Sequence, residues 1–279
     1  MQTEQNLTGY PSIDKPWLKY YKEEAINASL PECSIYEYLL ENNREHLDDV
    51  AIVYFGRKIT YGELLKNIDR CQRALSAFGV KENEIITIAL PSIPEALYLV
   101  YAANKIGAIA NMIHPLSGEN ELRNYLNEVS SRICFLFTGT YDIIKNSLEK
   151  TSVETAVVIS ASESLPFGIK QLYQIKTRKS SFTQTKKVIK WQSFLSKGEN
   201  VPLYAAKKNI HEVAIISHTG GTTREPKGVM CSDHNINTVI WEIECNLPHN
   251  RQEKTLVVLP PFINYSFVNA MLEPLAFGF

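Results

Sequence analysis

A short stretch around residue 220 gathers residue types that bind anions. Two adjacent glycines allow backbone N–H groups to turn toward a ligand without hindrance from a Cβ atom. Consecutive N–H groups and hydroxyl donors make a concave anion site, and a lysine adds a compact charge suited to phosphate oxygens. The residues that supply these groups are Thr219, Gly220, Gly221, Thr222, Thr223, Arg224 and Lys227. The stretch predicts a polyphosphate-binding loop; a Thr- and Gly-rich hairpin turn that binds nothing is the alternative.

The spacing of this loop differs from that of the common nucleotide-binding loops. The P-loop reads Gly-x-x-x-x-Gly-Lys-Ser/Thr and opens a helix, whereas here Lys227 comes directly before Gly228 and an apolar run follows. The dinucleotide fingerprint Gly-x-Gly-x-x-Gly does not occur at this stretch either. An apolar run at Val213–Ile216 leads into the loop, so we expect a strand there.

The residues from Thr219 to Gly228 read Thr-Gly-Gly-Thr-Thr-Arg-Glu-Pro-Lys-Gly. This string resembles the phosphate-binding signature of the adenylate-forming enzymes, Thr-Ser-Gly-Thr-Thr-Gly-x-Pro-Lys-Gly. The family includes acyl-CoA synthetases, luciferases and nonribosomal adenylation domains. Arg224 stands where the third loop glycine is usual. If that position requires φ > 0, an arginine there is strained, so either the loop takes another course or Arg224 adds a phosphate contact.

The resemblance implies ATP-dependent activation of a carboxylic acid to an acyl-adenylate, followed by transfer to CoA. It makes Lys227 and Thr222 the catalytic residues, which would hold the β- and γ-phosphates together with Thr223, while Mg²⁺ bridges phosphate oxygens. Two alternatives stay open. One is a nucleotide-binding relative without turnover, which Arg224 in place of glycine keeps open. The other is an adenylation domain that loads an amino or aryl acid onto a carrier protein.

A second motif lies near the end of the chain. The turn at residues 260–266, Pro-Pro-Phe-Ile-Asn-Tyr-Ser, resembles the aromatic-rich turn that begins the acid pocket of the family. It gives Phe262, Ile263, Asn264 and Tyr265 as substrate-pocket residues. Amino-acid-activating members place an aspartate there to hold the substrate amine, and no carboxylate is available here, so we expect an acid that lacks an α-amine. The alternative is that Phe262 and Tyr265 are simply core side chains.

The elements that position these motifs alternate between strand and helix. Short apolar runs at Ile85–Leu90, Ile109–Ile113, Ile133–Phe137 and Ala156–Ile159 predict four neighbouring strands. Because such strands between amphipathic helices are buried on both faces, we expect an α/β fold with mostly parallel sheets covered by helices on both faces.

Further elements follow from local signals. Ser34 and Thr60 each precede a glutamate by three residues, which predicts two capping boxes at helix starts. Ser232 or Asp233 is expected to cap a helix that runs to about residue 246. Near the end of the chain we expect a buried strand at residues 255–259 and an apolar helix at 268–275.

The domain organisation follows from these patterns and from the resemblance. Residues 1–32 lack periodicity and are expected to form an arm, and residues 33–279 an incomplete N-terminal AMP-binding domain. A basic stretch at about 160–210 is expected to be a solvated connector docked by Trp191 and Phe194, rather than a nucleic-acid patch. In the family, the adenine and ribose contacts and a mobile C-terminal domain lie beyond the matching motif. We therefore expect the C-terminal domain to be absent and the 279-residue chain alone to be inactive.

Composition limits the classes of partner and the compartment that we expect for the chain. Apolar residues make up 44% and charged residues 21%, and the net charge is −1, which gives no pull toward nucleic acid or anionic membranes. The polar amino terminus is no signal peptide, no stretch predicts a membrane span, and the five scattered cysteines indicate free thiols in a reducing cytoplasm. The spacing of the histidines and cysteines predicts no metal site. We expect self-association through apolar surface, so a homo-oligomer.

Overall fold

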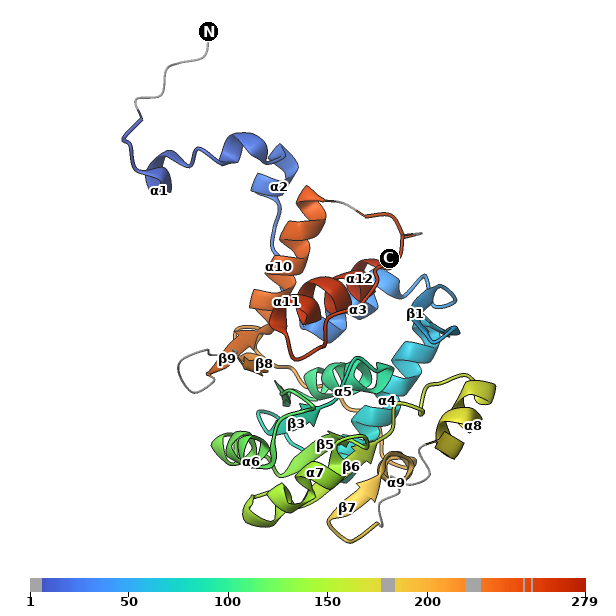
Figure 1. Cartoon of the computed structure of the whole chain (residues 1–279). Helices are drawn as coiled ribbons and strands as arrows, with labels where there is room; N and C mark the ends of the chain where they lie inside the picture. Colours follow the sequence, from blue (N-terminus) through green and yellow to red (C-terminus); the bar gives the residue numbers. More distant parts are fainter. Residues whose placement is uncertain (1–6, 177–183, 219–226, 248, 252) are drawn as a thin grey trace.

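A large sheet with helices on both faces forms the body of the chain (Figure 1). The computed structural model describes residues 7–176, 184–218, 227–247, 249–251 and 253–279. In this part of the chain the sheet has seven strands in the order β7–β6–β5–β3–β4–β8–β9. Their bounds are β3 Ile85–Ala89, β4 Ile109–Met112, β5 Ile133–Phe137, β6 Thr155–Ile159, β7 Val188–Lys190, β8 Val213–His218 and β9 Gly228–Ser232. Every neighbouring pair is parallel except β8–β9, which is antiparallel. The four strands predicted as neighbours lie side by side, which confirms the α/β fold.

The two faces of the sheet bury different side chains because successive strand residues point to opposite faces. In β5, Ile133 and Phe135 belong to the larger of two hydrophobic clusters, and Cys134 and Leu136 to the smaller one. The larger cluster packs under α4 (Tyr61–Ala77), α5 (Pro94–Lys105) and α9 (Trp191–Lys197). The smaller cluster packs under α6 (Glu119–Glu128), α7 (Tyr141–Ile144) and the 3₁₀ segment η2 (Lys145–Lys150).

Helices from the two ends of the body, which lie far apart in the sequence, pack together on the side of the larger cluster. They are α3 (Ile35–Asn43), α10 (Asp233–Asn246) and a continuous helical stretch made of α11 (Asn264–Ser266), the π-helical η4 (Phe267–Leu272) and α12 (Glu273–Phe277). The fully buried Asn43 donates from Nδ2 to the carbonyl oxygens of Leu275 and Ala276, both at 3.0 Å. These bonds satisfy carbonyls in the last turn of α12, which have no partner within the helix.

Most helix starts follow their sequence signals. The capping boxes at Ser34 and Ser232 are both formed, the latter with Asn235. At Thr60 only half of the predicted box forms: its hydroxyl accepts from the backbone N–H of Glu63, while the Glu63 carboxylate pairs with Arg57 instead. Arg57 lies on β2 (Arg57–Thr60), which forms a small antiparallel sheet with β1 (Val50–Tyr54).

The strand predicted at Thr255–Leu259 is wrong. This segment has no regular structure, and the side chains of Leu256 and Val258 are 82% and 75% exposed. An apolar run becomes a buried strand only where a neighbouring strand pairs with its backbone and another layer covers it. Within the described residues no strand pairs with this segment.

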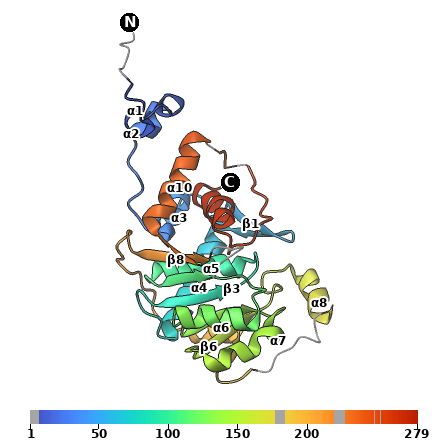
Figure 2. The ribbon, with the colours of Figure 1, turned by 60° about the vertical axis from the view of Figure 1, so that its left-hand side comes forward.

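Two other regions differ in character. The basic stretch contains α8 (Phe167–Lys176), β7 and α9, so part of it is an edge strand of the sheet, and the expected docking residues Trp191 and Phe194 are buried. The described part of the amino-terminal arm holds α1 (Pro11–Asp14), the 3₁₀ turn η1 (Leu18–Tyr20) and α2 (Glu23–Asn27), and it projects from the body (Figure 2). In the described chain, no helix combines the length and apolar character needed to cross a membrane.

Candidate functional site

The hairpin of β8 and β9 carries the two ends of the predicted phosphate loop. His218, the last residue of β8, pairs with Gly228, the first residue of β9. The loop residues Thr219, Gly220, Gly221, Thr222, Thr223 and Arg224 lie outside the described residues, and Lys227 is exposed directly before β9. Because β8 is parallel to β4, the loop leaves the sheet at the carboxyl edge of the parallel strands. That edge is where ligands bind in open α/β sheets.

A line of polar side chains crosses three strands at this edge. Asn111 on β4 lies opposite Thr87 on β3 and opposite Ile216 on β8. Its Nδ2 donates to Thr87 Oγ1 at 3.2 Å, and its Oδ1 lies 2.7 Å from His218 Nε2. Since an amide oxygen only accepts, the proton sits on Nε2 of His218. The line fixes the ring orientation of the last residue before the loop.

His218 is held as a neutral imidazole. Burial lowers its pKa from the usual 6.5, against the opposing effect of Glu128 and Glu121. The ring of Tyr125 on α6 packs against it at a centroid distance of 4.4 Å. Its Nδ1 is buried and makes no hydrogen bond within the described part of the chain. This nitrogen is therefore an acceptor at the entry to the loop.

Gly228 closes the loop where space is limited. A Cβ atom on Gly228 would lie 3.2 Å from Cγ2 of Ile216 and 3.5 Å from Cε1 of His218. The first contact is tighter than ordinary van der Waals packing, so a larger residue would require the Ile216 side chain to shift by a few tenths of an ångström. The glycine that follows the lysine in the motif is therefore the residue that fits at this position of the hairpin.

The predicted acid turn reaches the same edge from the opposite face of the sheet. Ser217 Oγ on β8 donates to Asn264 Oδ1 at 3.3 Å, and the ring of Phe262 lies 4.1 Å from the ring of His114, which follows β4. The structure therefore brings Asn264 to the end of β8, directly before the loop, and Phe262 to His114 at the end of the neighbouring strand β4. Ile263 and Tyr265 are exposed, Tyr265 by 70%, so Tyr265 is not a core side chain.

The polar residues of this edge were not singled out from the sequence. Thr87 and Asn111 are polar residues inside otherwise apolar strands, and both are fully buried. That contrast is the signal that would have found them, because a polar side chain is buried only where it has a partner. Ser217 and His114 carry no comparable signal.

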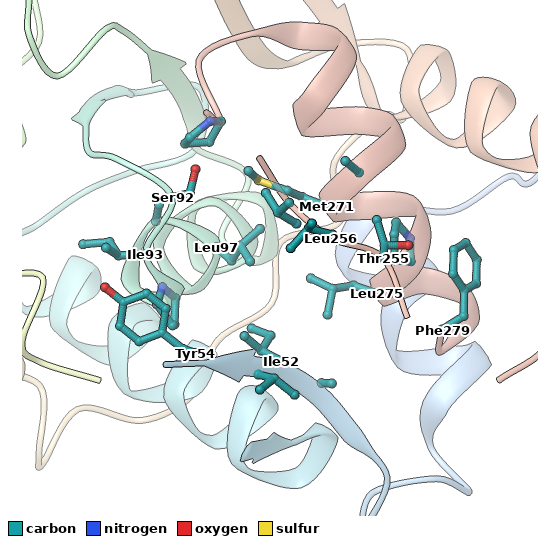
Figure 3. A pocket seen from close by; sticks show the side chains of 18 of the residues that line it. Ile52, Tyr54, Ser92, Ile93, Leu97, Thr255, Leu256, Met271, Leu275 and Phe279 are labelled. Carbon is teal, nitrogen blue, oxygen red and sulfur yellow. The ribbon is translucent and has the colours of Figure 1, made fainter. Parts of the chain in front are cut away.

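An apolar cavity of about 400 Å³ lies on the other side of the acid turn (Figure 3). Residues of β1, the start of α5, the segment at 255–257 and the helical stretch η4–α12 line it, with Ile52, Leu97, Leu256, Met271 and Leu275 among them. Of the acid turn only Pro261 contributes, and no residue of β8 or β9 does. The cavity is therefore separate from the loop edge.

Comparison with known proteins identifies the family. The model of the "AMP-binding enzyme" family matches residues 39–279. The chain belongs to the AMP-binding enzyme family. The chain is 25% identical over 272 residues to a long-chain-fatty-acid–CoA ligase of Bacillus subtilis (strain 168), and the match covers 95% of this chain and 49% of that protein. It is 28% identical over 230 residues to an acetyl-coenzyme A synthetase of Penicillium chrysogenum, covering 78% and 31%. This AMP-binding chain thus spans half or less of the length of these two relatives.

Solved structures of the family share the fold. The anthranilate CoA ligase AuaEII in complex with anthranoyl-AMP superposes with a TM-score of 0.74 at 18% identity, covering 91% of this chain and 45% of that one. A long-chain-fatty-acid–CoA ligase from Archaeoglobus fulgidus gives a TM-score of 0.71 at 19% identity, covering 89% and 46%. The described fold is thus that of the amino-terminal part of the ligases.

Proposed function

We propose that this chain contributes the phosphate-binding half of an AMP-forming acid–thiol ligase. The observation that carries the proposal is the β8–β9 hairpin. It brings both ends of the loop to the carboxyl edge of the parallel sheet, where Ser217 of β8 is bonded to Asn264 of the acid turn, in a chain of the AMP-binding family. The loop and the acid turn are the two parts that must meet for a carboxylate to reach a nucleotide phosphate.

The chemistry assigned to the loop is electrostatic. A carboxylate oxygen attacks the α-phosphorus of ATP, the bond to the β-phosphate oxygen breaks, and pyrophosphate leaves with that electron pair. Since both reactants are anions, the step needs fixed cations and N–H donors. Lys227 and Thr222 would hold the β- and γ-phosphates, with Thr219, Gly220, Gly221, Thr223 and Arg224 completing the loop. The thiol of CoA would then attack the acyl carbon and displace AMP.

The described donors at this edge fit ATP better than they fit a tightly held metal. Thr87, Asn111, Ser217, His218 and Asn264 are all neutral donors or acceptors. Because this set includes no carboxylate, Mg²⁺ would be held here mainly through phosphate oxygens, the mode that Mg²⁺ favours. It would supply charge neutralisation on the phosphates.

The acid turn favours a substrate without an α-amine. Ile263 and Asn264 occupy the position where an aspartate would pair an ammonium group, and the Asn264 amide is engaged by Ser217. An α-ammonium placed there would lose its water without gaining a counter-charge. A carboxylic acid with an apolar remainder carries no such cost, so simple acyl or aryl acids are the proposed substrate class.

Acid-dependent exchange between ATP and labelled pyrophosphate tests the proposal. The protein encoded by the whole reading frame that contains this chain is incubated with a panel of fatty, short-chain, aryl and amino acids. Exchange with acids that lack an α-amine, followed by thioester formation with CoA, is the expected result. ATP binding without any exchange would favour the non-catalytic relative. Exchange with amino acids and no CoA thioester would favour carrier-protein loading.

A further inference from the structure

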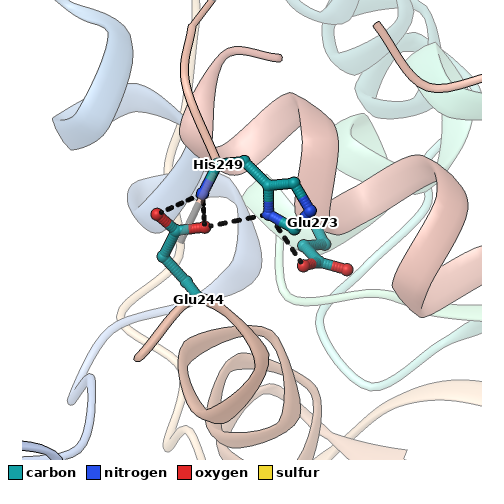
Figure 4. A group of neighbouring side chains, drawn as sticks. All are labelled: Glu244, His249 and Glu273. Carbon is teal, nitrogen blue, oxygen red and sulfur yellow. Dashed lines mark hydrogen bonds and ion pairs between the residues drawn. The ribbon is translucent and has the colours of Figure 1, made fainter. Parts of the chain in front are cut away.

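Three metal-ligating side chains meet outside the loop and the acid turn. Glu244 lies in the last turn of α10, His249 in the segment that follows, and Glu273 is the first residue of α12. His249 Nδ1 lies 3.3 Å from Glu244 Oε2 and 4.0 Å from Glu273 Oε1. One ligand atom from each residue lies within 4.8 Å of the others (Figure 4). The three side chains converge on one point from two helices and the segment between them.

Glu273 supplies a second, independent observation. Its side chain is only 4% exposed, and its Oε1 is buried without a hydrogen-bond partner in the described part of the chain. In Figure 4 this carboxylate is directed at the His249 ring. A buried carboxylate is stable when it is paired with a cation or coordinates a metal, and otherwise it takes up a proton; burial raises the pKa of Glu273 to about 7, against the opposing effect of His249. Glu273 Oε1 has no hydrogen-bond donor among the described residues and only the His249 ring at 4.0 Å, which places it to take a cation between the three residues.

We propose that Glu244, His249 and Glu273 bind one divalent transition-metal ion, with Zn²⁺ as the representative. Zn–N and Zn–O bonds of about 2.0–2.2 Å in a tetrahedral site place ligand atoms roughly 3.4 Å apart. The separations of 3.3 and 4.0 Å between His249 Nδ1 and the two carboxylates reach this value with shifts of less than an ångström, and all three ligand atoms lie within 4.8 Å of one another. Imidazole nitrogen and carboxylate oxygen are both ligands that zinc takes in proteins, and with three protein ligands a water would take the fourth position. Mg²⁺ and Ca²⁺ prefer oxygen ligands only, so the imidazole disfavours them.

The surroundings of the cluster hold the imidazole in place. The ring of Phe279 stacks on His249 with centroids 4.1 Å apart and planes inclined by 18°. The backbone N–H of His249 donates to the Glu244 carboxylate at 3.3 Å. These contacts limit rotation of the ring, so Nδ1 stays on the side of the two carboxylates. A bound ion would join the last turn of α10 to the junction of η4 and α12.

Zinc titration of the intact chain tests the site. After treatment with a chelator, the chain is titrated with ZnCl₂ by calorimetry, and we expect one ion per chain. Glu273→Gln and His249→Gln should each weaken zinc binding by at least about tenfold. Glu242→Gln, on an exposed position of the same helix, and Cys245→Ser, next to Glu244, should leave it unchanged. At a free Zn²⁺ concentration about 100 times Kd, the unfolding equilibrium constant should fall about 100-fold.

X-ray absorption at the zinc edge of the loaded wild-type chain provides a readout that does not depend on any variant folding. Nitrogen and oxygen ligands alone are expected. Sulfur in the coordination shell, zinc binding unchanged by Glu273→Gln and His249→Gln, or no zinc uptake would each overturn the proposal. None of these outcomes depends on the ligase function, since the assay uses no ATP, acid or CoA.

Discussion

Replacing Asn111 with leucine should destabilise the fold through the polar line that ends at His218. The substitution removes two hydrogen bonds, to Thr87 at 3.2 Å and to His218 at 2.7 Å. Each contributes about 1 kcal/mol net, and the buried Nε2–H of His218 is left without an acceptor at a further cost of about 1–3 kcal/mol. Leucine keeps the branched shape of asparagine and adds apolar contacts that offset part of this loss. We expect a decrease in the free energy of unfolding of about 2–3 kcal/mol.

Urea unfolding followed by circular dichroism measures the change as a shift of the midpoint at constant slope. Asn127→Leu is the matched control, because Asn127 is exposed and makes one 3.2 Å bond to the carbonyl of Lys150; its effect should stay within about 0.5 kcal/mol. A double-mutant cycle of Asn111→Leu with His218→Ala should give a coupling of about 1 kcal/mol. A loss below about 0.5 kcal/mol for Asn111→Leu, or no coupling, would refute the role assigned to the line.

Three other changes test the loop and the core. Lys227→Ala should lower acid-dependent pyrophosphate exchange on the order of 100-fold, the scale for one charge-stabilising donor. The control variant Lys254→Ala should leave the exchange unchanged. Activity of Lys227→Ala within about twofold of the parent would show that Lys227 is not part of the site. Arg224→Gly should keep or raise the same activity, and a collapse of ATP affinity in calorimetry would show instead that the arginine is a phosphate ligand. Burial raises the pKa of Glu95 to about 7 from 4.5, so its stabilising contribution is present below the unfolded pKa and is lost as pH rises through 7. Glu95→Gln should therefore be more stable than the parent at about pH 8, on the order of 2 kcal/mol, and urea midpoints that fall equally with pH in both proteins would contradict this.

Local apolar patterns were enough to predict the body of the sheet. The strands at residues 85–89, 109–112, 133–137 and 155–159 are buried on both faces, so a continuous apolar run identifies each without knowledge of its neighbours. The segment at Thr255–Leu259 has the same pattern and is exposed. The difference lies in pairing, which depends on residues far away in the sequence.

Sites assembled from distant residues could not be predicted, because they too depend on contacts between residues far apart in the sequence. The loop could be predicted because its donors are contiguous in the sequence. Phe262 and Asn264 could be predicted because they also lie within one short, contiguous turn. The line from Thr87 through Asn111 to His218 spans three strands, and the side chains of Glu244, His249 and Glu273 come from two helices and a connecting segment. None of these sets has a spacing that stands out along the chain.

The two hydrophobic clusters differ in when they can form as the chain is synthesised. The smaller cluster, under α6 and η2, takes all its members from residues 89–188. The larger one needs Ile35 near one end and Ala276 near the other. At a translation rate of about 5–20 residues per second, the last members of the larger cluster emerge roughly 5–20 seconds after those of the smaller one. During that interval the face under α4 and α5 lacks part of its cover, so a chaperone that shields nascent apolar surface should engage this face and release it once η4 and α12 arrive.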